Sequence, residues 1–392
     1  MKLKRGEDRR LRAGHLWIFS NEVDTKITPL TDFEPGAVVQ VVSDKDQFLG
    51  FAYVNPRTLI AARIVGRDAD FPLDQSLVVH RLKVAQALRE RLYREPFYRL
   101  VFGESDGLPG LVLDRYGDVV VAQSGTAGID RLRPQIEAAV AKVTNAGTVV
   151  WKNDSGAREL EGLERSVSLA GAGAPPAEIH VREQGADFQA PLADGQKTGW
   201  FYDQAANRER LRRYLPAGAR VLDVCSYVGA WAVTALTNGA ASATCVDSSA
   251  TALEFAARNA RANGVEISAV KDDAFDALKA LQESGARFDV VILDPPAFAK
   301  RKRDVPQAQA AYRKLNQLAL PLIDKDGILV SCSCSYHMGE DDLLAAIQGA
   351  ARHTSRFVQV LELGGQSPDH PVHPAIPETR YLKSFFCRVH RE

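Results

Sequence analysis

The chain has 392 residues, and its 49 Lys and Arg balance 49 Asp and Glu, so the formal net charge is zero. Its 45% hydrophobic and 25% charged residues are ordinary for a soluble globular protein. No uninterrupted apolar run approaches the roughly 20 residues needed to span a bilayer, and the basic N-terminus lacks the apolar core of a signal peptide. We therefore expect a cytoplasmic protein of two or three domains with no membrane partner.

The cysteines exclude two further classes of protein. They are odd in number and all lie in the second half of the chain: Cys225, Cys245, Cys332, Cys334 and Cys387. This usage argues against a disulfide framework and favours a reducing compartment. No C-x-x-C pair is present and His337 has no obvious companion ligands, so we expect no metal site.

Basic residues gather in three places despite the zero net charge. They are the first twelve residues, the run Lys300–Arg303, and the segment 207–213. Any one such run is usually a solvated face, but three on one chain favour an anionic partner.

The first two segments of the chain differ in their patterning. Residues 1–70 predict a small β-rich domain, with β-branched or aromatic runs at 37–43, 48–54 and 59–66. Residues 71–188 predict a mixed α+β domain. Its expected elements are a helix at 75–93 and strands within 110–123 and 146–154, with a Gly/Ala/Pro-rich loop at 169–178.

Residues 189–392 alternate strand and helix signals, which predicts an α/β domain with a Rossmann-like, seven-stranded sheet. The expected strands are 220–226, 242–247, 266–272, 288–294, 327–334, 357–363 and 381–389. A helix is expected at 250–264, with Ser248 and Ser249 as cap candidates and Gly264 as its stop. The alternation predicts a parallel sheet with ligands bound at the carboxyl ends of its strands.

An acidic residue follows each of the first three strands of this domain. Asp223 precedes a tight turn through Gly229, where the backbone can approach a ligand, but the turn lacks the G-x-G-x-x-G pattern of NAD sites. Asp247 can accept bonds from ribose hydroxyls, and Asp273 from an adenine amino group. Each is also a common helix cap, but together they fit S-adenosylmethionine. We assign Ser226 and Ser248 to the same site.

The fourth strand ends in Asp294, followed by Pro295, Pro296 and Phe298. The prolines stiffen the loop and hold the carboxylate over the site, and Phe298 offers a face on which a base can stack. Pro-Pro can also simply end a strand. The whole motif, however, indicates methylation of a planar nitrogenous base.

The fifth strand carries Cys332 and Cys334, which share one side of a strand by its two-residue period. Cys334 lies nearer the carboxyl end, so we predict that it is the nucleophile. Cys332 is interpreted as a small buried hydrophobic residue.

With the stretches "GQKTGWFYDQ" and "ESDGLPGLVLDRYG", these motifs resemble the RlmI family of 23S rRNA 5-methylcytidine methyltransferases. The N-terminal "GHLWIFSNEV" and "PGAVVQVV" resemble that family's PUA RNA-binding domain. The resemblance implies that Cys334 is the nucleophile, that Asp294 is the catalytic carboxylate, and that Asp203 and Gln204 belong to the cofactor site. Two positions depart from the family pattern: Cys332 is a second thiol, and Ala205 replaces an Arg for which Arg208 can substitute.

We therefore predict an S-adenosylmethionine-dependent enzyme that forms 5-methylcytidine in 23S rRNA through a Cys334–cytosine adduct. Arg301, Lys302 and Arg303 are expected to contact phosphates beside the target base. The alternatives are an exocyclic-amine RNA methyltransferase, which needs no cysteine, and a non-catalytic RNA-binding ribosome-assembly factor. The sequence leaves the oligomeric state open, with a homodimer among the alternatives.

Overall fold

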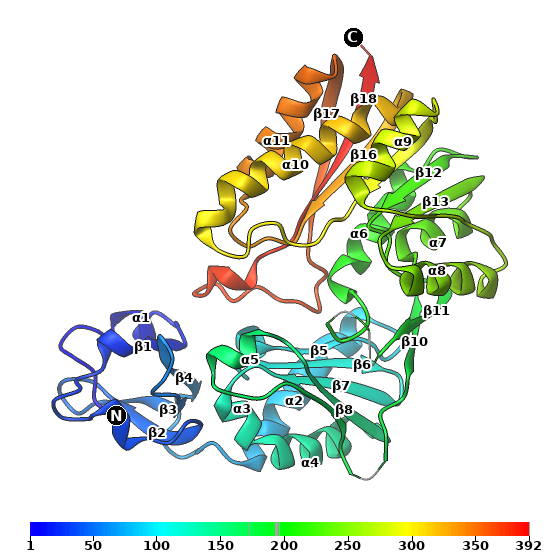
Figure 1. Cartoon of the computed structure of the whole chain (residues 1–392). Helices are drawn as coiled ribbons and strands as arrows, with labels where there is room; N and C mark the ends of the chain where they lie inside the picture. Colours follow the sequence, from blue (N-terminus) through cyan, green and yellow to red (C-terminus); the bar gives the residue numbers. More distant parts are fainter. Residues whose placement is uncertain (172, 193–194, 196, 392) are drawn as a thin grey trace. The chain divides into compact units, whose positions relative to one another are not determined.

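The computed structural model describes residues 1–171, 173–192, 195 and 197–391. The chain forms two compact units (Figure 1). The first comprises Met1–Ile179, Pro191–Tyr202 and Asp369–Thr379, and the second comprises His180–Ala190, Asp203–Pro368 and Arg380–Glu392. Each unit thus contains segments that are distant in sequence. Within the described residues, no helix has both the length and the apolar character that crossing a bilayer requires.

The N-terminal part of the first unit is a four-stranded sheet in the order β1-β4-β3-β2. Its strands are β1 (Trp17–Phe19), β2 (Ala37–Val42), β3 (Phe48–Val54) and β4 (Ile60–Gly66), and the short helix α1 (Arg9–Arg12) precedes them. The expected strands are confirmed. The strand β1 was not foreseen, because three residues are too short for a recognisable alternation.

The rest of the first unit is built on a five-stranded sheet in the order β5-β6-β7-β8-β9. The strands are β5 (Phe97–Phe102), β6 (Leu111–Tyr116), β7 (Val119–Ser124), β8 (Thr148–Asn153) and β9 (Ser166–Leu169). The helices α2 (Gln75–Leu92) and α4 (Arg133–Thr144) share a hydrophobic core with it. The mixed α+β organisation is therefore confirmed.

The second unit contains the seven-stranded sheet, ordered β14-β13-β12-β15-β16-β18-β17. The strands are β12 (Arg220–Val224), β13 (Ser242–Asp247), β14 (Ser268–Lys271), β15 (Phe288–Leu293), β16 (Ile323–Ser333), β17 (Arg356–Gly365) and β18 (Lys383–Arg391). The first five run parallel, and the chain order reverses between β12 and β15. The expectation of a wholly parallel sheet is wrong at one edge, because β18 inserts antiparallel between β16 and β17.

Helices cover both faces of this sheet (Figure 1). They are α6 (Ala205–Tyr214), α7 (Ala230–Thr237) and α8 (Ala250–Ala262) on one face, and α9 (Ala274–Glu283), α10 (Val305–Ala319) and α11 (Glu340–His353) on the other. Alternate strand residues serve the two faces. On β12, Val221 packs with the first set and Leu222 with the second. The carboxyl ends of β12 and β15 thus lie at the reversal of strand order, where such sheets bind ligands.

Gly229 is needed for packing as well as for the turn that it makes. Its φ is +78°, and a Cβ atom built on it would lie 2.8 Å from the Cβ atom of Ala256 in α8. The close approach visible in the structure is thus between this turn and a helix. The close approach of a ligand to Gly229, expected from the sequence, stays a prediction.

We predict that Gly229→Ala lowers the free energy of unfolding by more than Gly218→Ala does. Both positions have positive φ, which costs an L-residue about 1–2 kcal/mol, but a Cβ atom at Gly218 meets no atom within 4 Å. Urea unfolding of the two variants measures the difference. Equal decreases would show that α8 moves aside at no cost.

Candidate active site

The turn after β12 is held tightly against the neighbouring strand. Cys225 and Tyr227 have positive φ values of 62° and 48°. The Ser226 N–H donates to the Val246 carbonyl at 3.0 Å, and the Tyr227 N–H donates to Asp247 Oδ2 at 2.9 Å. Strained backbone that is fixed by its neighbours is typical of ligand-binding turns.

Asp223 lies at the end of β12 and is completely buried. Its Oδ2 accepts a hydrogen bond from the Ala232 N–H at 3.2 Å, whereas Oδ1 accepts none from the described residues. Burial, and then the charge of Asp294, raises the pKa of Asp223 to about 8. A buried carboxylate oxygen without a donor is costly, so this atom is a candidate contact for a cationic or hydrogen-donating ligand.

Asp294 follows β15 and is oriented from two sides. Its Oδ1 accepts a hydrogen bond from Gln204 Nε2 at 2.9 Å, and its Oδ2 accepts one from Trp231 Nε1 at 3.1 Å. Burial raises the pKa of this carboxyl group too. The carboxyl group is therefore held in one orientation. The Asp294 N–H donates to the carbonyl of Val224, which places the residue beside the turn after β12.

The rest of the Asp-Pro-Pro-x-Phe loop combines buried and exposed groups. Pro295 is buried and Pro296 is exposed. Phe298 is partly buried, with its ring centroid 4.8 Å from that of Tyr312 and 6.5 Å from that of Phe275. Part of the Phe298 ring is thus already occupied by protein contacts.

The segment before α6 meets the same site. Gln204 Oε1 accepts a hydrogen bond from Asn207 Nδ2 at 2.7 Å, which fixes the amide that holds Asp294. Buried Asp203 accepts a hydrogen bond from the Tyr381 hydroxyl at 2.5 Å. Burial and the charge of Asp203 raise the pKa of the Asp294 carboxyl group, whereas hydrogen bonds from the protein lower it. Asp203 and Asp294 therefore lie within electrostatic range of each other.

Arg208 lies one helical turn after Ala205 and is buried. It forms a bidentate pair with Glu183 of β10 (Glu178–Glu183), at 2.6 and 2.7 Å. Its positive charge also acts on Asp203 and Asp294. Arg208 therefore supplies a cation near these acids, although its guanidinium is committed to Glu183.

The other acids at the strand ends have local partners. Asp247 accepts hydrogen bonds from the backbone of both Tyr227 and Ser249, each at 2.9 Å. Ser249 caps α8, and Ser248 is exposed beside it. Exposed Asp273 caps α9 by accepting a hydrogen bond from the Phe275 N–H at 2.8 Å. The predicted cofactor residues Asp247, Ser248 and Asp273 thus all lie at the carboxyl edge of the sheet, as expected.

The two cysteines have different environments. Cys332 is 1% exposed, and its sulfur accepts a hydrogen bond from the Ser384 hydroxyl at 3.1 Å. Burial raises the pKa of Cys332 well above the usual range. Cys334 follows the last residue of β16 and is half-buried. A thiol that is partly exposed is the better candidate for a nucleophile.

Ser335 ties the cysteine loop to the Asp-Pro-Pro-x-Phe loop. Its Oγ accepts a hydrogen bond from the Ala299 N–H at 3.2 Å and lies 3.4 Å from the Tyr312 hydroxyl. Its own N–H donates to Ser333 Oγ at 3.3 Å, a contact that spans Cys334. The two motifs singled out in the sequence therefore meet.

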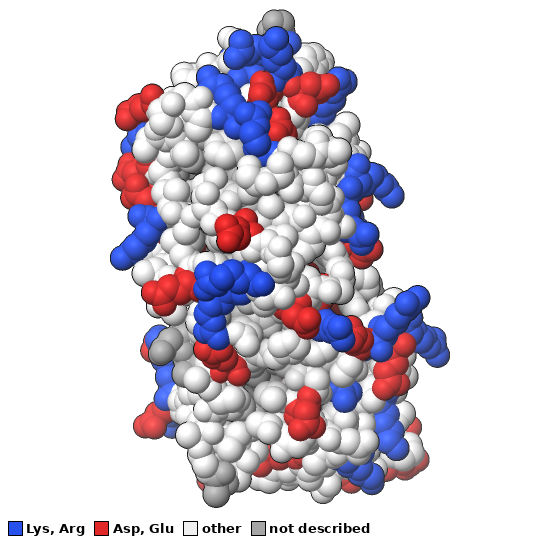
Figure 2. All heavy atoms as spheres, turned by 90° about the vertical axis from the view of Figure 1, so that its right-hand side faces the viewer, with Lys and Arg blue, Asp and Glu red and all other residues white. Residues whose placement is uncertain are grey.

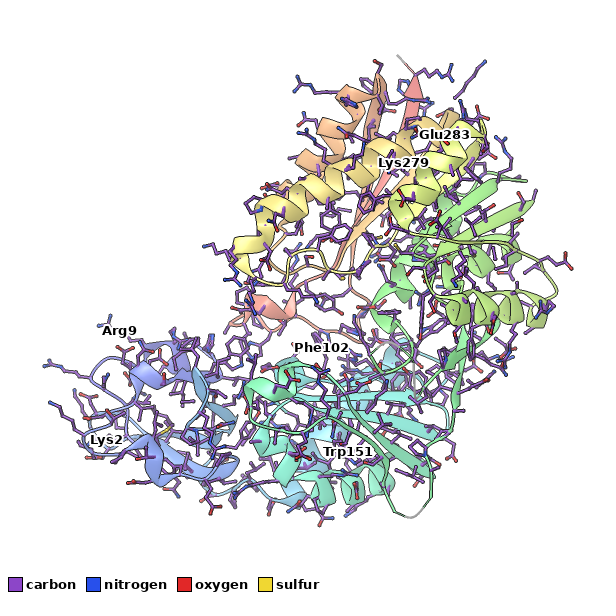
Figure 3. All side chains as sticks on the ribbon, in the orientation of Figure 1. Lys2, Arg9, Phe102, Trp151, Lys279 and Glu283 are labelled. Carbon is purple, nitrogen blue, oxygen red and sulfur yellow. The ribbon has the colours of Figure 1, made fainter. Side chains whose placement is uncertain are left out.

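The basic clusters are only partly available to a partner. At the N-terminus, Lys2 pairs with Asp46, Arg10 with Glu22 and Arg12 with Asp8. Exposed Arg9 projects from α1 (Figure 3). In α6, Arg208, Arg210 and Arg213 all pair with glutamates. Arg301, Lys302 and Arg303 are exposed, and Arg303 forms a long ion pair with Asp304 at 3.8 Å.

On the face drawn in Figure 2, basic and acidic residues lie next to one another in small groups, and uncharged surface lies between these groups. This distribution agrees with the zero formal charge of the whole chain.

Sequence reasoning missed several side chains that shape the site. Trp231 orients Asp294, Tyr381 binds Asp203, and Lys383 donates to backbone carbonyls beside Cys334. Lys383 left a weak signal, because it lies directly before the run Ser384–Cys387, which is predominantly apolar. Asn259 of α8 and Asn263, which follows that helix, also bind the backbone of β11 (Ala186–Pro191), a strand that was not predicted.

Comparison with known proteins agrees with this architecture. A family model for a PUA-like domain matches residues 1–67, and a model for S-adenosylmethionine-dependent methyltransferases matches residues 164–383. Ribosomal RNA large subunit methyltransferase I of Erwinia tasmaniensis is 35% identical over 99% of this chain and 98% of its own length. The protein of that name from Klebsiella pneumoniae is also 35% identical, over 99% of this chain and 97% of its own.

A crystal structure of SMU.776 complexed with SAH superposes with a TM-score of 0.83 at 23% identity, covering 99% of each chain. This likeness concerns the fold. The matches to the curated relatives extend over nearly the whole sequence and confirm the resemblance drawn from its motifs. The chain belongs to the family of S-adenosylmethionine-dependent methyltransferases that includes the ribosomal RNA large subunit methyltransferase I proteins.

Proposed function

We propose that this protein methylates carbon 5 of a cytosine in 23S ribosomal RNA and that Cys334 is its nucleophile. The observation that carries the proposal is the link through Ser335 between the cysteine loop and the loop of Asp294. Relatives named ribosomal RNA large subunit methyltransferase I support an RNA substrate. The base and the position within it are our inference from the pairing of a thiol with Asp-Pro-Pro.

The residues at the carboxyl edge fit the cofactor. S-adenosylmethionine, when bound, supplies an electrophilic methyl group on a positively charged sulfur. Asp223 has a buried oxygen without a donor among the described residues, and the charges of Asp294 and Asp247 disfavour its ionisation further. A cation relieves this repulsion. The residues that we assign to the cofactor are Asp203, Gln204, Asp223, Ser226, Gly229, Asp247, Ser248 and Asp273.

The chemistry follows from the properties of cytosine and of two side chains. Carbon 5 of cytosine is a poor nucleophile, but attack of the Cys334 thiolate on carbon 6 makes it enamine-like. Asp294, oriented by Gln204 and Trp231, is suited to bond N3 and the exocyclic amine as charge develops. After methylation, loss of the carbon-5 proton expels Cys334. Pro295, Pro296 and Phe298 shape the pocket that receives the base.

RNA binding completes the proposal. We keep the domain boundaries 1–70, 71–188 and 189–392, with the first domain as an RNA-binding module. The target cytosine must leave its stack to reach Cys334, so we expect a single-stranded or flipped-out nucleotide. Arg301, Lys302 and Arg303 follow the Asp294 loop and are exposed, which suits contacts to flanking phosphates. We also infer a cytoplasmic location, because the relatives named for ribosomal RNA are bacterial proteins.

The rival function is methylation of an exocyclic amine of adenine or guanine. The Asp-Pro-Pro-x-Phe motif favours it equally, since that chemistry needs an oriented carboxylate and a stacking surface but no thiol. Cys334 therefore discriminates the two.

Cys334→Ala should reduce methyl transfer to 23S rRNA by at least about a thousand-fold, because covalent activation of the base is abolished. Affinity for S-adenosylhomocysteine should be unchanged. Cys332→Ala is the matched control and should retain substantial activity, with a small decrease in stability from its buried position. Incorporation of labelled methyl groups measures the first effect and calorimetry the second. Turnover of Cys334→Ala near the wild-type rate would support the exocyclic-amine reaction instead.

Replacing Arg301, Lys302 and Arg303 together with alanine should weaken RNA binding. The slope of the logarithm of the binding constant against the logarithm of the salt concentration should become shallower. The expected change is about 0.7 for each phosphate of a single strand that the variant no longer neutralises. The base that is methylated should not change, because phosphate contacts do not specify sequence. Lys279→Ala is the control, since this exposed lysine on α9 pairs with Asp276 (Figure 3). Titrations at several salt concentrations measure the slope. An unchanged slope and affinity would mean that the run is only solvated surface.

A further inference from the structure

Lys383 is a buried cation in the sheet beside the cysteine loop. It is the first residue of β18, where it pairs with Ser333 of β16 and Gly365 of β17. The residue is only 5% exposed. It forms no ion pair with a carboxylate of the described residues, and burying an ammonium without such a partner costs several kcal/mol. Stability alone therefore gives no reason for a lysine here.

The contacts of Lys383 lead to Cys334. Its Nζ donates to the Ser335 carbonyl at 2.6 Å and to the Tyr381 carbonyl at 2.9 Å. Ser335 follows Cys334 directly, and the charges of Lys383 and Cys334 interact. The amine is thus anchored next to the residue to which we assign the nucleophilic role.

Two carbonyl acceptors suit both protonation states of this amine. A neutral amine has two N–H groups, which these carbonyls satisfy, and keeps one lone pair. In the ammonium form, the same position carries a third N–H. The anchoring of Lys383 therefore survives the gain or loss of one proton, as a proton acceptor requires.

The charges around Lys383 leave it close to that equilibrium. Burial lowers its pKa to about 8, against the opposing effect of Cys334. The negative charges of Glu340 and Asp342, at the start of α11, raise the pKa of Lys383, and the positive charge of Arg380 lowers it. None of these side chains contacts Nζ within the described residues. The amine therefore exchanges its proton near pH 8 and not in the ordinary range of lysine.

Other groups near the cysteine loop are less suited to accept its proton. Burial raises the pKa of Tyr312 to about 12, so that its phenol is protonated at neutral pH. Both oxygens of Asp294 accept hydrogen bonds from Gln204 and Trp231.

We propose that Lys383 activates Cys334 by accepting its thiol proton and stabilising the resulting thiolate. The S–H bond breaks and its electron pair stays on sulfur, while the proton forms the third N–H bond on Nζ. When the Cys334 thiolate is later expelled from the base, it takes the proton back from this ammonium, which restores the thiol and the neutral amine. The inference rests on the proposed role of Cys334, and Lys383 is a positioning residue, since it acts through that thiol.

Alkylation of Cys334 tests this pairing without RNA or cofactor. The full-length protein is treated with iodoacetamide over a range of pH, and labelling of the Cys334 peptide is followed by mass spectrometry. In the wild type, the apparent pKa of the reaction should lie below the ordinary thiol value of about 8.5. Lys383→Gln, which keeps N–H donors for the carbonyls, should raise that pKa by about one unit and slow labelling at neutral pH about tenfold.

Two further variants separate charge from structure. Lys383→Arg keeps a cation and should retain most of the lowered pKa, whereas Lys325→Gln, at an exposed lysine of β16, should change nothing. A purely structural role would alter thermal unfolding but leave the pH profile unmoved, and that result would overturn the inference. An ordinary thiol pKa in the wild type would overturn it without any variant. Methyl transfer by Cys334→Ala would instead refute the proposed function, whatever the alkylation shows.

Discussion

Removal of acidic side chains from water, complete for Asp223 and partial for Asp294, is the constraint around which this active site is organised. Asp223 and Asp294 lie at the ends of neighbouring strands. Removal from water disfavours the charged form of each side chain and so raises the pKa of both carboxyl groups. The protein relieves part of this cost with the backbone of α7 and with the side chains of Trp231 and Gln204. It leaves Oδ1 of Asp223 without a donor from the described residues. A buried carboxyl group that lacks a donor on one oxygen is suited to a cofactor whose positive charge favours its ionisation.

The same arrangement explains why so much of the site lies outside the strands themselves. Parallel strands bring their carboxyl ends to one edge, and the turns there carry the acids, the strained Cys225 and Tyr227, and the half-buried Cys334. Ser335 then couples the cysteine loop to the Asp294 loop. Polar contacts and apolar packing of Phe298 against Tyr312 together hold these loops, so substitutions in them should affect folding as well as function.

Much of this could be predicted because the information is local. Apolar runs alternate with helical patterns, and acids follow successive strands, so the Rossmann-like domain and its carboxyl edge were recognisable. What failed depends on partners distant in sequence. The antiparallel insertion of β18 and the contact between Gly229 and Ala256 leave no trace in either segment alone. Charge was similarly ambiguous: the pairing of Arg208 with Glu183 shows that a basic run can be consumed inside the fold.

The central claim is that these acidic groups form the binding site of a cationic cofactor. Proton release on cofactor binding tests this claim most directly. Because the pKa of Asp223 is raised to about 8, its carboxyl group is largely protonated below that pH in the free protein. Binding a cation should ionise it. Calorimetry at about pH 6.5, in two buffers of different ionisation enthalpy, should show S-adenosylmethionine releasing about one proton per site. Asp223→Asn should release clearly less, and a wild-type protein that releases no proton would contradict the account.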